Sequence, residues 1–174
     1  MQDHVDFEHL TLRDALDLAI LIEDEARERY EGFSRVVGGR YAGDASDMFR
    51  AMAGYEARHG EELAERRRKL FGDAPAQLDR DSLEDVEAPD RSAPRPFMSA
   101  RQAMEVAYAS EEKAADFFAE ALEHVSDPEV RALFQELHGE ELRHQQWVKE
   151  RLVVLPIGPD LEDDEADEPG SDGG

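Results

Sequence analysis

The chain has 174 residues, enough for one domain with a hydrophobic core. Its 43 acidic residues outnumber its 20 basic residues, and the formal net charge of −23 repels nucleic acid and anionic membranes while attracting cations. The absence of cysteine excludes disulfides, zinc–thiolate sites and cysteine-bound iron. No apolar run is long enough to span a bilayer, and the first ten residues lack the pattern of a signal peptide. We therefore expect a cytoplasmic protein.

Four stretches of the chain carry the periodicity of amphipathic helices, at about residues 12–37, 45–70, 100–125 and 128–155. Residues that favour helix ends flank each stretch. The N-terminal caps are Thr11, Asp44 or Ser46, Ser99 with Gln102 as a capping box, and Asp127 followed by Pro128; the C-terminal stops are Gly38 with Gly39, Gly72 and Pro156.

The connection between the second and third helices, residues 73–96, is rich in proline, aspartate and alanine. A connection of this length can run the whole length of a helical bundle, so the third helix can start parallel to the second. The other two connections are short and predict antiparallel hairpins. We therefore predict an all-α four-helix bundle, made of two helical hairpins joined by a long crossover between helices 2 and 3.

Residues 1–157 are predicted to form this bundle, with a linker at 73–96, and residues 158–174 an acidic, disordered tail. Blocks of like charge usually stay solvated, which favours a solubilising role for the tail. The alternative is that the tail attracts iron or docks a partner.

The chain contains an internal repeat. Apolar residues recur in steps of four and three along each helix, which keeps one seam facing the other helices. The first and third helices match position for position, and so do the second and fourth. Each seam is broken by polar residues near the helix midpoint: Glu23, Glu56 with His59, Glu111, and Glu141 with His144.

These six seam residues predict a metal centre. The two Glu-x-x-His pairs place each glutamate and its histidine on one helical face. Four carboxylates in one apolar layer would be costly and would repel one another, whereas two divalent cations would balance their charge. Carboxylate oxygens and one imidazole per metal suit iron or manganese. The surface alternative, a solvated face, fits one such pair alone but not two pairs in phase with the seam.

Nearby residues leave further alternatives. Glu62, one turn beyond His59, is expected at the surface and could also contact iron transiently. Tyr30 and Phe118 are expected in the core, although Tyr30 could hydrogen-bond a ligand carboxylate. Tyr55 is expected to pack beside the seam. No residues specify a pocket for an organic substrate.

The strings Glu23-x-x-Ala26-x-x-x-Tyr30, Glu56-x-x-His59, Glu111-x-x-Ala114-x-x-x-Phe118 and Glu141-x-x-His144 resemble the rubrerythrin and ferritin-like superfamily of di-iron carboxylate proteins, over roughly residues 10–155. The resemblance implies a di-iron centre bridged by Glu56 and Glu141. Glu23 with His59 and Glu111 with His144 would then be the terminal ligands of the two irons.

The chain departs from that family in two ways. Typical rubrerythrins carry a further glutamate where this chain has Ala114, so the ligand count is closer to that of bacterioferritin. Typical rubrerythrins also append a rubredoxin domain, which a cysteine-free chain cannot form. A peroxidase role would therefore require an external electron donor. The chain is also similar to the erythrin-type domains that precede membrane iron-transport domains in some proteins.

The resemblance implies three functions. The first is a ferroxidase that binds two Fe(II) ions and oxidises them with O₂ or H₂O₂, in iron handling and protection against oxidative stress. The second is a rubrerythrin-type peroxide reductase with a separate redox donor. The third is a bundle that binds iron or docks a partner without turnover, and manganese could replace iron. The six seam residues would be both ligands and catalytic residues, and we expect a homodimer.

Overall fold

The computed structural model describes residues 5–37, 44–78 and 86–157 and contains four long helices. They are α1 (Leu12–Val37), α2 (Ala45–Phe71), α3 (Ala100–His124) and α4 (Pro128–Val154). Their ends agree with the predicted ends to within one residue. The described residues contain no strand, and the prediction of an all-α fold is confirmed.

Capping residues explain where the helices begin. The side chain of Asp44 accepts a hydrogen bond from the backbone of Asp47, and Asp127 caps α4 ahead of Pro128. Ser99 and Gln102 form the predicted capping box at the start of α3. Each cap satisfies backbone N–H groups that have no partner inside the helix. At the end of α2, Gly72 adopts a φ of 60°, a conformation that glycine tolerates best.

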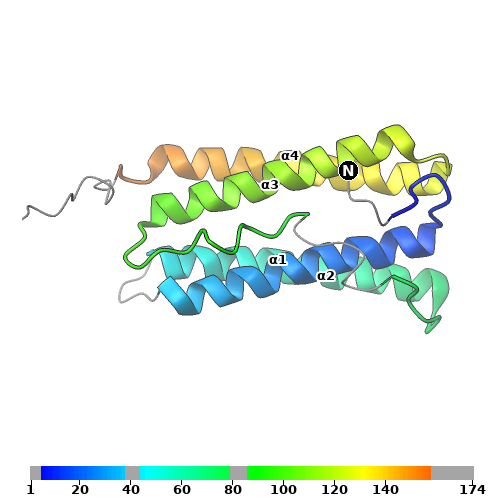
Figure 1. Ribbon diagram of the computed structural model, residues 1–174, viewed down its shortest axis with the longest axis horizontal. Coiled ribbons are helices and arrows are strands. Elements are labelled where there is room, and N and C mark those ends of the chain that lie inside the picture. Colours follow the sequence, from blue (N-terminus) through cyan, green and yellow to red (C-terminus); the bar gives the residue numbers. More distant parts are fainter. Residues whose placement is uncertain (1–4, 38–43, 79–85, 158–174) are drawn as a thin grey trace, which may run out of the picture.

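The helices form two antiparallel hairpins, α1–α2 and α3–α4, joined by a long crossover (Figure 1). The crossover returns along the bundle, so α3 starts at the same end as α2 and runs parallel to it. This is the predicted topology. It brings the midpoints of all four helices to one level.

The hydrophobic core has two clusters, one on each side of that level. One cluster includes Leu16, Ile22, Phe118 and Phe134. The other includes Ala26, Tyr30, Phe33, Phe49 and Met52. Along α1 the first cluster ends at Ile22 and the second begins at Ala26, so Glu23 lies between them. The polar layer therefore lies between two apolar layers along the length of the bundle.

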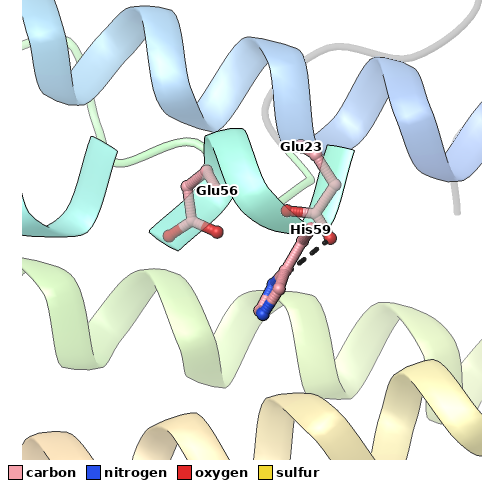
Figure 2. Close-up of side chains that lie close together, drawn as sticks. All are labelled: Glu23, Glu56 and His59. Carbon is pink, nitrogen blue, oxygen red and sulfur yellow. Dashed lines mark ion pairs between the residues drawn. The ribbon is translucent and has the colours of Figure 1, made fainter. Parts of the chain in front are cut away.

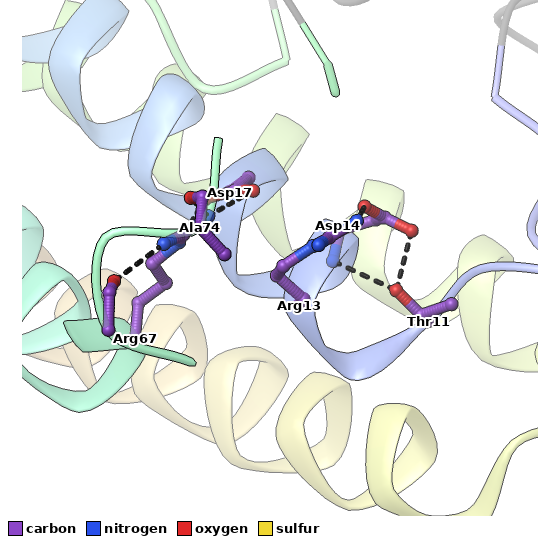
Figure 3. A network of polar contacts seen from close by, with 7 residues as sticks. Thr11, Arg13, Asp14, Asp17, Arg67 and Ala74 are labelled. Carbon is purple, nitrogen blue, oxygen red and sulfur yellow. Dashed lines mark hydrogen bonds and ion pairs between the residues drawn. The ribbon is translucent and has the colours of Figure 1, made fainter. Parts of the chain in front are cut away.

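Arg67 ties the end of α2 to α1 and to the start of the crossover. Its guanidinium donates hydrogen bonds to both carboxylate oxygens of Asp17, at 2.7 and 3.2 Å, and to the carbonyls of Gly72 and Ala74 (Figure 3). The fork of donors in arginine suits a carboxylate and several carbonyls at once. The path of the chain out of α2 is fixed in this way.

Some sequence predictions fail or lie outside the described residues. The apolar seam of α2 continues to Leu70, but this side chain is 53% exposed, because α2 extends past the core at its C-terminal end. The stop at Gly38 and Gly39, part of the linker and the predicted tail from residue 158 fall outside the described ranges. None of the described helices combines the length and apolar character that a membrane span needs.

Candidate metal centre

The structure brings all six seam residues together at the middle of the bundle. Glu23 of α1 and the pair Glu56 and His59 of α2 form one group, whose potential ligand atoms lie within 4.8 Å of one another. Glu111 of α3 and the pair Glu141 and His144 of α4 form a second group by the same criterion. Each hairpin therefore supplies two carboxylates and one imidazole.

The first group is loosely associated. Nδ1 of His59 lies 3.9 Å from a carboxylate oxygen of Glu23. In Figure 2 the side chains of Glu23, Glu56 and His59 extend from α1 and α2 toward the α3–α4 hairpin. The carboxylate of Glu56 lies beside that of Glu23 without a bond to the imidazole. This loose arrangement leaves space for a cation between the three groups.

The second group is tighter. Nδ1 of His144 is 3.2 Å from a carboxylate oxygen of Glu111 and 3.5 Å from one of Glu141. The imidazole thus bridges the two carboxylates of its own hairpin. Gln145, the next residue of α4, donates a hydrogen bond to the backbone carbonyl of Glu111 and fixes α4 against α3.

The two imidazoles face each other. The rings of His59 and His144 are stacked, with centroids 4.6 Å apart and planes inclined by 11°. Their side chains are 20% and 22% exposed, whereas the four carboxylates on the seams are buried. The histidines therefore lie on the side of the polar layer that is open to solvent.

The buried carboxylates lack partners. Both oxygens of Glu56 and one oxygen each of Glu23, Glu111 and Glu141 are buried without a hydrogen-bond partner among the described residues. Buried polar atoms are nearly always paired in folded proteins, and unpaired ones cost stability. Several unpaired oxygens converging beside two imidazoles are the donor set that iron or manganese prefers. The residues therefore fit a pair of metal ions.

Electrostatics in the metal-free chain support this view. Burial, followed by the negative charges of Glu56 and Glu141, raises the pKa of Glu23 well above its ordinary value. Burial likewise raises the pKa of Glu56. Burial raises the pKa of Glu111 to about 7, although the hydrogen bond from His144 opposes the shift. Without a cation, these groups therefore tend to hold protons that a metal would displace.

The two histidines differ in the direction of their pKa shifts. Burial and the neighbouring His144 lower the pKa of His59. Burial also disfavours the charged form of His144, but its hydrogen bond with Glu111 and its contact with Glu141 outweigh burial and raise its pKa to about 10. A proton on His144 therefore takes the place of a cation in the second group, while the first group has no such substitute.

Sequence reasoning missed one buried carboxylate. Glu87, in the crossover, is 1% exposed, and its potential ligand oxygens lie within 4.8 Å of those of Glu23 and Glu141, and of those of Glu56 and Glu111. Burial, followed by the charges of Glu23 and Glu141, raises its pKa well above the ordinary value. The only sequence signal was an isolated acid between apolar neighbours, in Val86-Glu87-Ala88-Pro89.

Sequence reasoning also missed a recess beside the second group. A cavity of about 240 Å³ is lined by Met52, Tyr55, Glu111, Arg143, His144 and Trp147. Tyr55 and Trp147 pack together, with ring centroids 5.1 Å apart. The sequence offered no substrate pocket, because Trp147 lies off the seam and its partner belongs to another helix.

Two other predictions can be compared with the structure. Tyr30 is fully buried and stacks on Phe49, as expected for a core residue, and it makes no hydrogen bond to a described carboxylate. Glu62 is exposed, as expected. Its charge nevertheless acts on His59, so the two residues lie close enough to interact.

Comparison with known proteins agrees with this fold. No curated protein matches the chain significantly. An uncharacterised conserved protein from Magnetospirillum magnetotacticum MS-1 is 26% identical, and its crystal structure matches with a TM-score of 0.66 over 86% of this chain and 98% of that one. A hypothetical protein from Pyrococcus furiosus, 19% identical, shares the fold with a TM-score of 0.52 over 83% of this chain and 90% of its own. The rubrerythrin family profile matches residues 14–152, so this chain belongs to the rubrerythrin family.

Proposed function

We propose that this protein binds two iron ions at the bundle centre and oxidises Fe(II) with O₂ or H₂O₂. Glu23, Glu56 and His59 would hold one ion, and the other group, Glu111, Glu141 and His144, would hold the second. The observation that carries the proposal is the convergence of buried carboxylate oxygens, without partners, on two imidazoles. A bound metal pair would supply a place for two electrons to leave together.

The residues of the chain have distinct tasks in this proposal. The carboxylates bind the cations and can change how many oxygens they offer. The stacked histidines limit access on the solvent side. The proton that His144 holds beside Glu111 must leave when a cation takes its place. Metal uptake would therefore release protons to solvent.

Access for the two substrates is supported by different features. Fe(II) is a cation, and the net charge of −23 raises its concentration near the surface. Glu62 acts on His59 and would attract Fe(II) toward the first group. O₂ and H₂O₂ are neutral, and the partly apolar recess at Tyr55 and Trp147 leads to Glu111 and His144. We propose this recess as the path of the oxidant.

A peroxide reductase with an external donor is the second candidate. The contact between Tyr55 and Trp147 favours it, because these partly buried aromatic rings line the same recess as Glu111 and His144. Repeated turnover with H₂O₂ and a reductant would support this function. Stoichiometric oxidation that ends when Fe(II) is consumed would support the ferroxidase.

The test is anaerobic titration of the metal-free protein with Fe(II), followed by addition of O₂ or H₂O₂. We expect two irons per chain and rapid oxidation. The double variant Glu56→Ala/Glu141→Ala should bind neither iron tightly, because each group loses its central carboxylate. The control Glu61→Ala/Glu150→Ala removes one exposed carboxylate from each of the same helices and should behave like the wild type.

Two results would contradict the proposal. Absence of stoichiometric binding by the wild type would overturn the metal centre itself. Tight binding of two irons without any reaction toward either oxidant would keep the metal centre and replace the enzyme by a binding protein. We expect neither result.

A further inference from the structure

The crossover inserts one short segment into the interior of the bundle. Residues 86–89 are buried, although most of the rest of the described crossover is partly or fully exposed. Within this segment only Glu87 has a charged side chain. The side chains of Val86, Ala88 and Pro89 are apolar. A carboxylate in such a place loses its hydration and needs a compensating partner.

Two cationic side chains hold this segment in place. Arg29 of α1 donates a hydrogen bond to the carbonyl of Pro89 at 2.7 Å, and Lys113 of α3 donates one to the carbonyl of Ala88 at 3.0 Å. Both bonds go to the backbone, and neither goes to the carboxylate of Glu87. The crossover is therefore fastened to both hairpins, while its one buried carboxylate is directed elsewhere. In Figure 1 the crossover passes between α1 and α3.

The carboxylate of Glu87 extends from the crossover to the candidate metal centre. Its oxygens group with those of Glu23 and Glu141, and separately with those of Glu56 and Glu111. Each of these groups takes one carboxylate from each hairpin. Glu87 therefore lies between the two candidate metal positions rather than beside one of them.

Nothing in the described residues neutralises Glu87. Both of its oxygens are buried without a hydrogen-bond partner. A leucine or glutamine of similar size would avoid the penalty of burying an unpaired carboxylate. Stability alone therefore does not explain a glutamate at this position, and a cation at the centre would.

We propose that Glu87 is a fifth carboxylate ligand of the metal pair, carried by the crossover, and that metal binding fastens the crossover to the bundle. This inference rests on the proposed metal centre. It adds that the ligand set includes a residue outside the four helices. It also adds that the crossover becomes harder to displace when metal is bound.

The test compares the wild type with Glu87→Gln, using Mn(II) as a probe that needs no oxidant. Glutamine keeps the shape and lacks the charge, so the metal-free bundle should fold normally by circular dichroism. Removing a ligand should weaken binding of Mn(II) by roughly tenfold to hundredfold, at least the effect of losing a group that supports a ligand. The control Asp73→Asn removes an exposed carboxylate from the same crossover and should bind Mn(II) like the wild type.

Trypsin provides a second readout that does not depend on activity. Arg91 is exposed, four residues after Glu87, and its cleavage reports displacement of the crossover. Mn(II) should slow cleavage after Arg91 in the wild type and in Asp73→Asn but not in Glu87→Gln. A further variant, Glu87→Leu, should raise the Tm of the metal-free protein and still bind Mn(II) weakly. It tests the proposal even if Glu87→Gln folds poorly.

The outcomes separate this inference from the proposed function. Wild-type protein that binds no Mn(II) or Fe(II) would overturn both. Wild-type protein that binds two ions, with Glu87→Gln and Glu87→Leu binding them equally well and equally protected from trypsin, would overturn the role of Glu87 alone. Weaker binding and lost protection in the variants would support it.

Discussion

The two hairpins contribute the same ligand types but hold them differently. In the α3–α4 hairpin, His144 contacts both Glu111 and Glu141, and its pKa is raised to about 10. In the α1–α2 hairpin, the nearest contact of His59 to Glu23 is 3.9 Å, and its pKa is lowered. In the absence of metal, the protonated His144 therefore offsets carboxylate charge in the α3–α4 hairpin. His59 does not do so in the α1–α2 hairpin.

The residues around the ligands differ even more. One turn beyond each histidine, α2 carries the exposed Glu62 and α4 carries Trp147. Immediately before each central glutamate, α2 carries Tyr55 and α4 carries Glu140. The repeat thus preserves the positions that would bind metal and varies the positions around them. Duplicated ligands therefore lie in unlike surroundings, which in the proposed function would serve Fe(II) on one side and the oxidant on the other.

The pH dependence of stability should give the largest effect. Between pH 4.5 and about 7, the folded metal-free chain keeps a proton on Glu111 that the unfolded chain has released. Above pH 6.5 the same applies to His144, up to about pH 10. Stability should therefore fall as pH rises, by about 1.4 kcal/mol per pH unit for each retained proton.

Urea denaturation of metal-free protein between pH 5 and 9 measures this slope. Glu111→Gln should make the slope between pH 5 and 7 shallower, because the folded state loses that one retained proton, while Glu23, Glu56 and Glu87 keep theirs. With metal bound, stability should instead rise with pH, because the ligands bind metal in their deprotonated forms. A metal-free stability that rises with pH over this range would contradict the assigned shifts.

Replacing either histidine should change stability by a smaller amount, and the loss should differ between the two hairpins. His144→Ala removes the cationic partner of Glu111 and Glu141, and should destabilise the metal-free bundle by about 2 kcal/mol at pH 7. His59→Ala removes the loose contact with Glu23 and the stacking on His144, and should cost less, about 1 kcal/mol. Urea denaturation of both variants without metal tests the order. Equal losses would mean that the two halves are equivalent.

The smallest expected effect concerns the approach of Fe(II). Glu62→Gln should slow Fe(II) uptake by at most about fivefold at low salt, because one exposed charge contributes about 1 kcal/mol or less. The difference should disappear at high ionic strength. Stopped-flow absorbance can follow the reaction, with Glu120→Gln as an exposed control on α3. Slower uptake that persists in high salt would point to direct ligation by Glu62.

Much of this molecule follows from its sequence. The caps at Asp44, Ser99 and Asp127 locate the helix starts because their chemistry is local. The step of four and three places Glu23 and Glu111 on inner faces, because a helix converts spacing directly into direction. The gathering of the six residues at one level follows from antiparallel hairpins of nearly equal length.

The parts that the sequence did not predict lack such periodicity. Glu87 lies in an irregular segment, where no spacing rule relates position to direction. The recess depends on Tyr55 and Trp147, which come from different helices and meet only through the packing of the bundle. The contrast between His59 and His144 depends on differences of less than 1 Å, which a repeat in the sequence does not encode.

The position of Glu87 has a consequence for oxidation state. With Glu87 counted as a ligand, five carboxylates share one buried layer: Glu23, Glu56, Glu87, Glu111 and Glu141. Two divalent ions leave this layer with one excess negative charge, and two trivalent ions leave it with one excess positive charge. Four carboxylates alone would make the divalent pair neutral and give the trivalent pair two excess charges. Because buried net charge is unfavourable, a single residue of the crossover would make the loss of two electrons electrostatically easier.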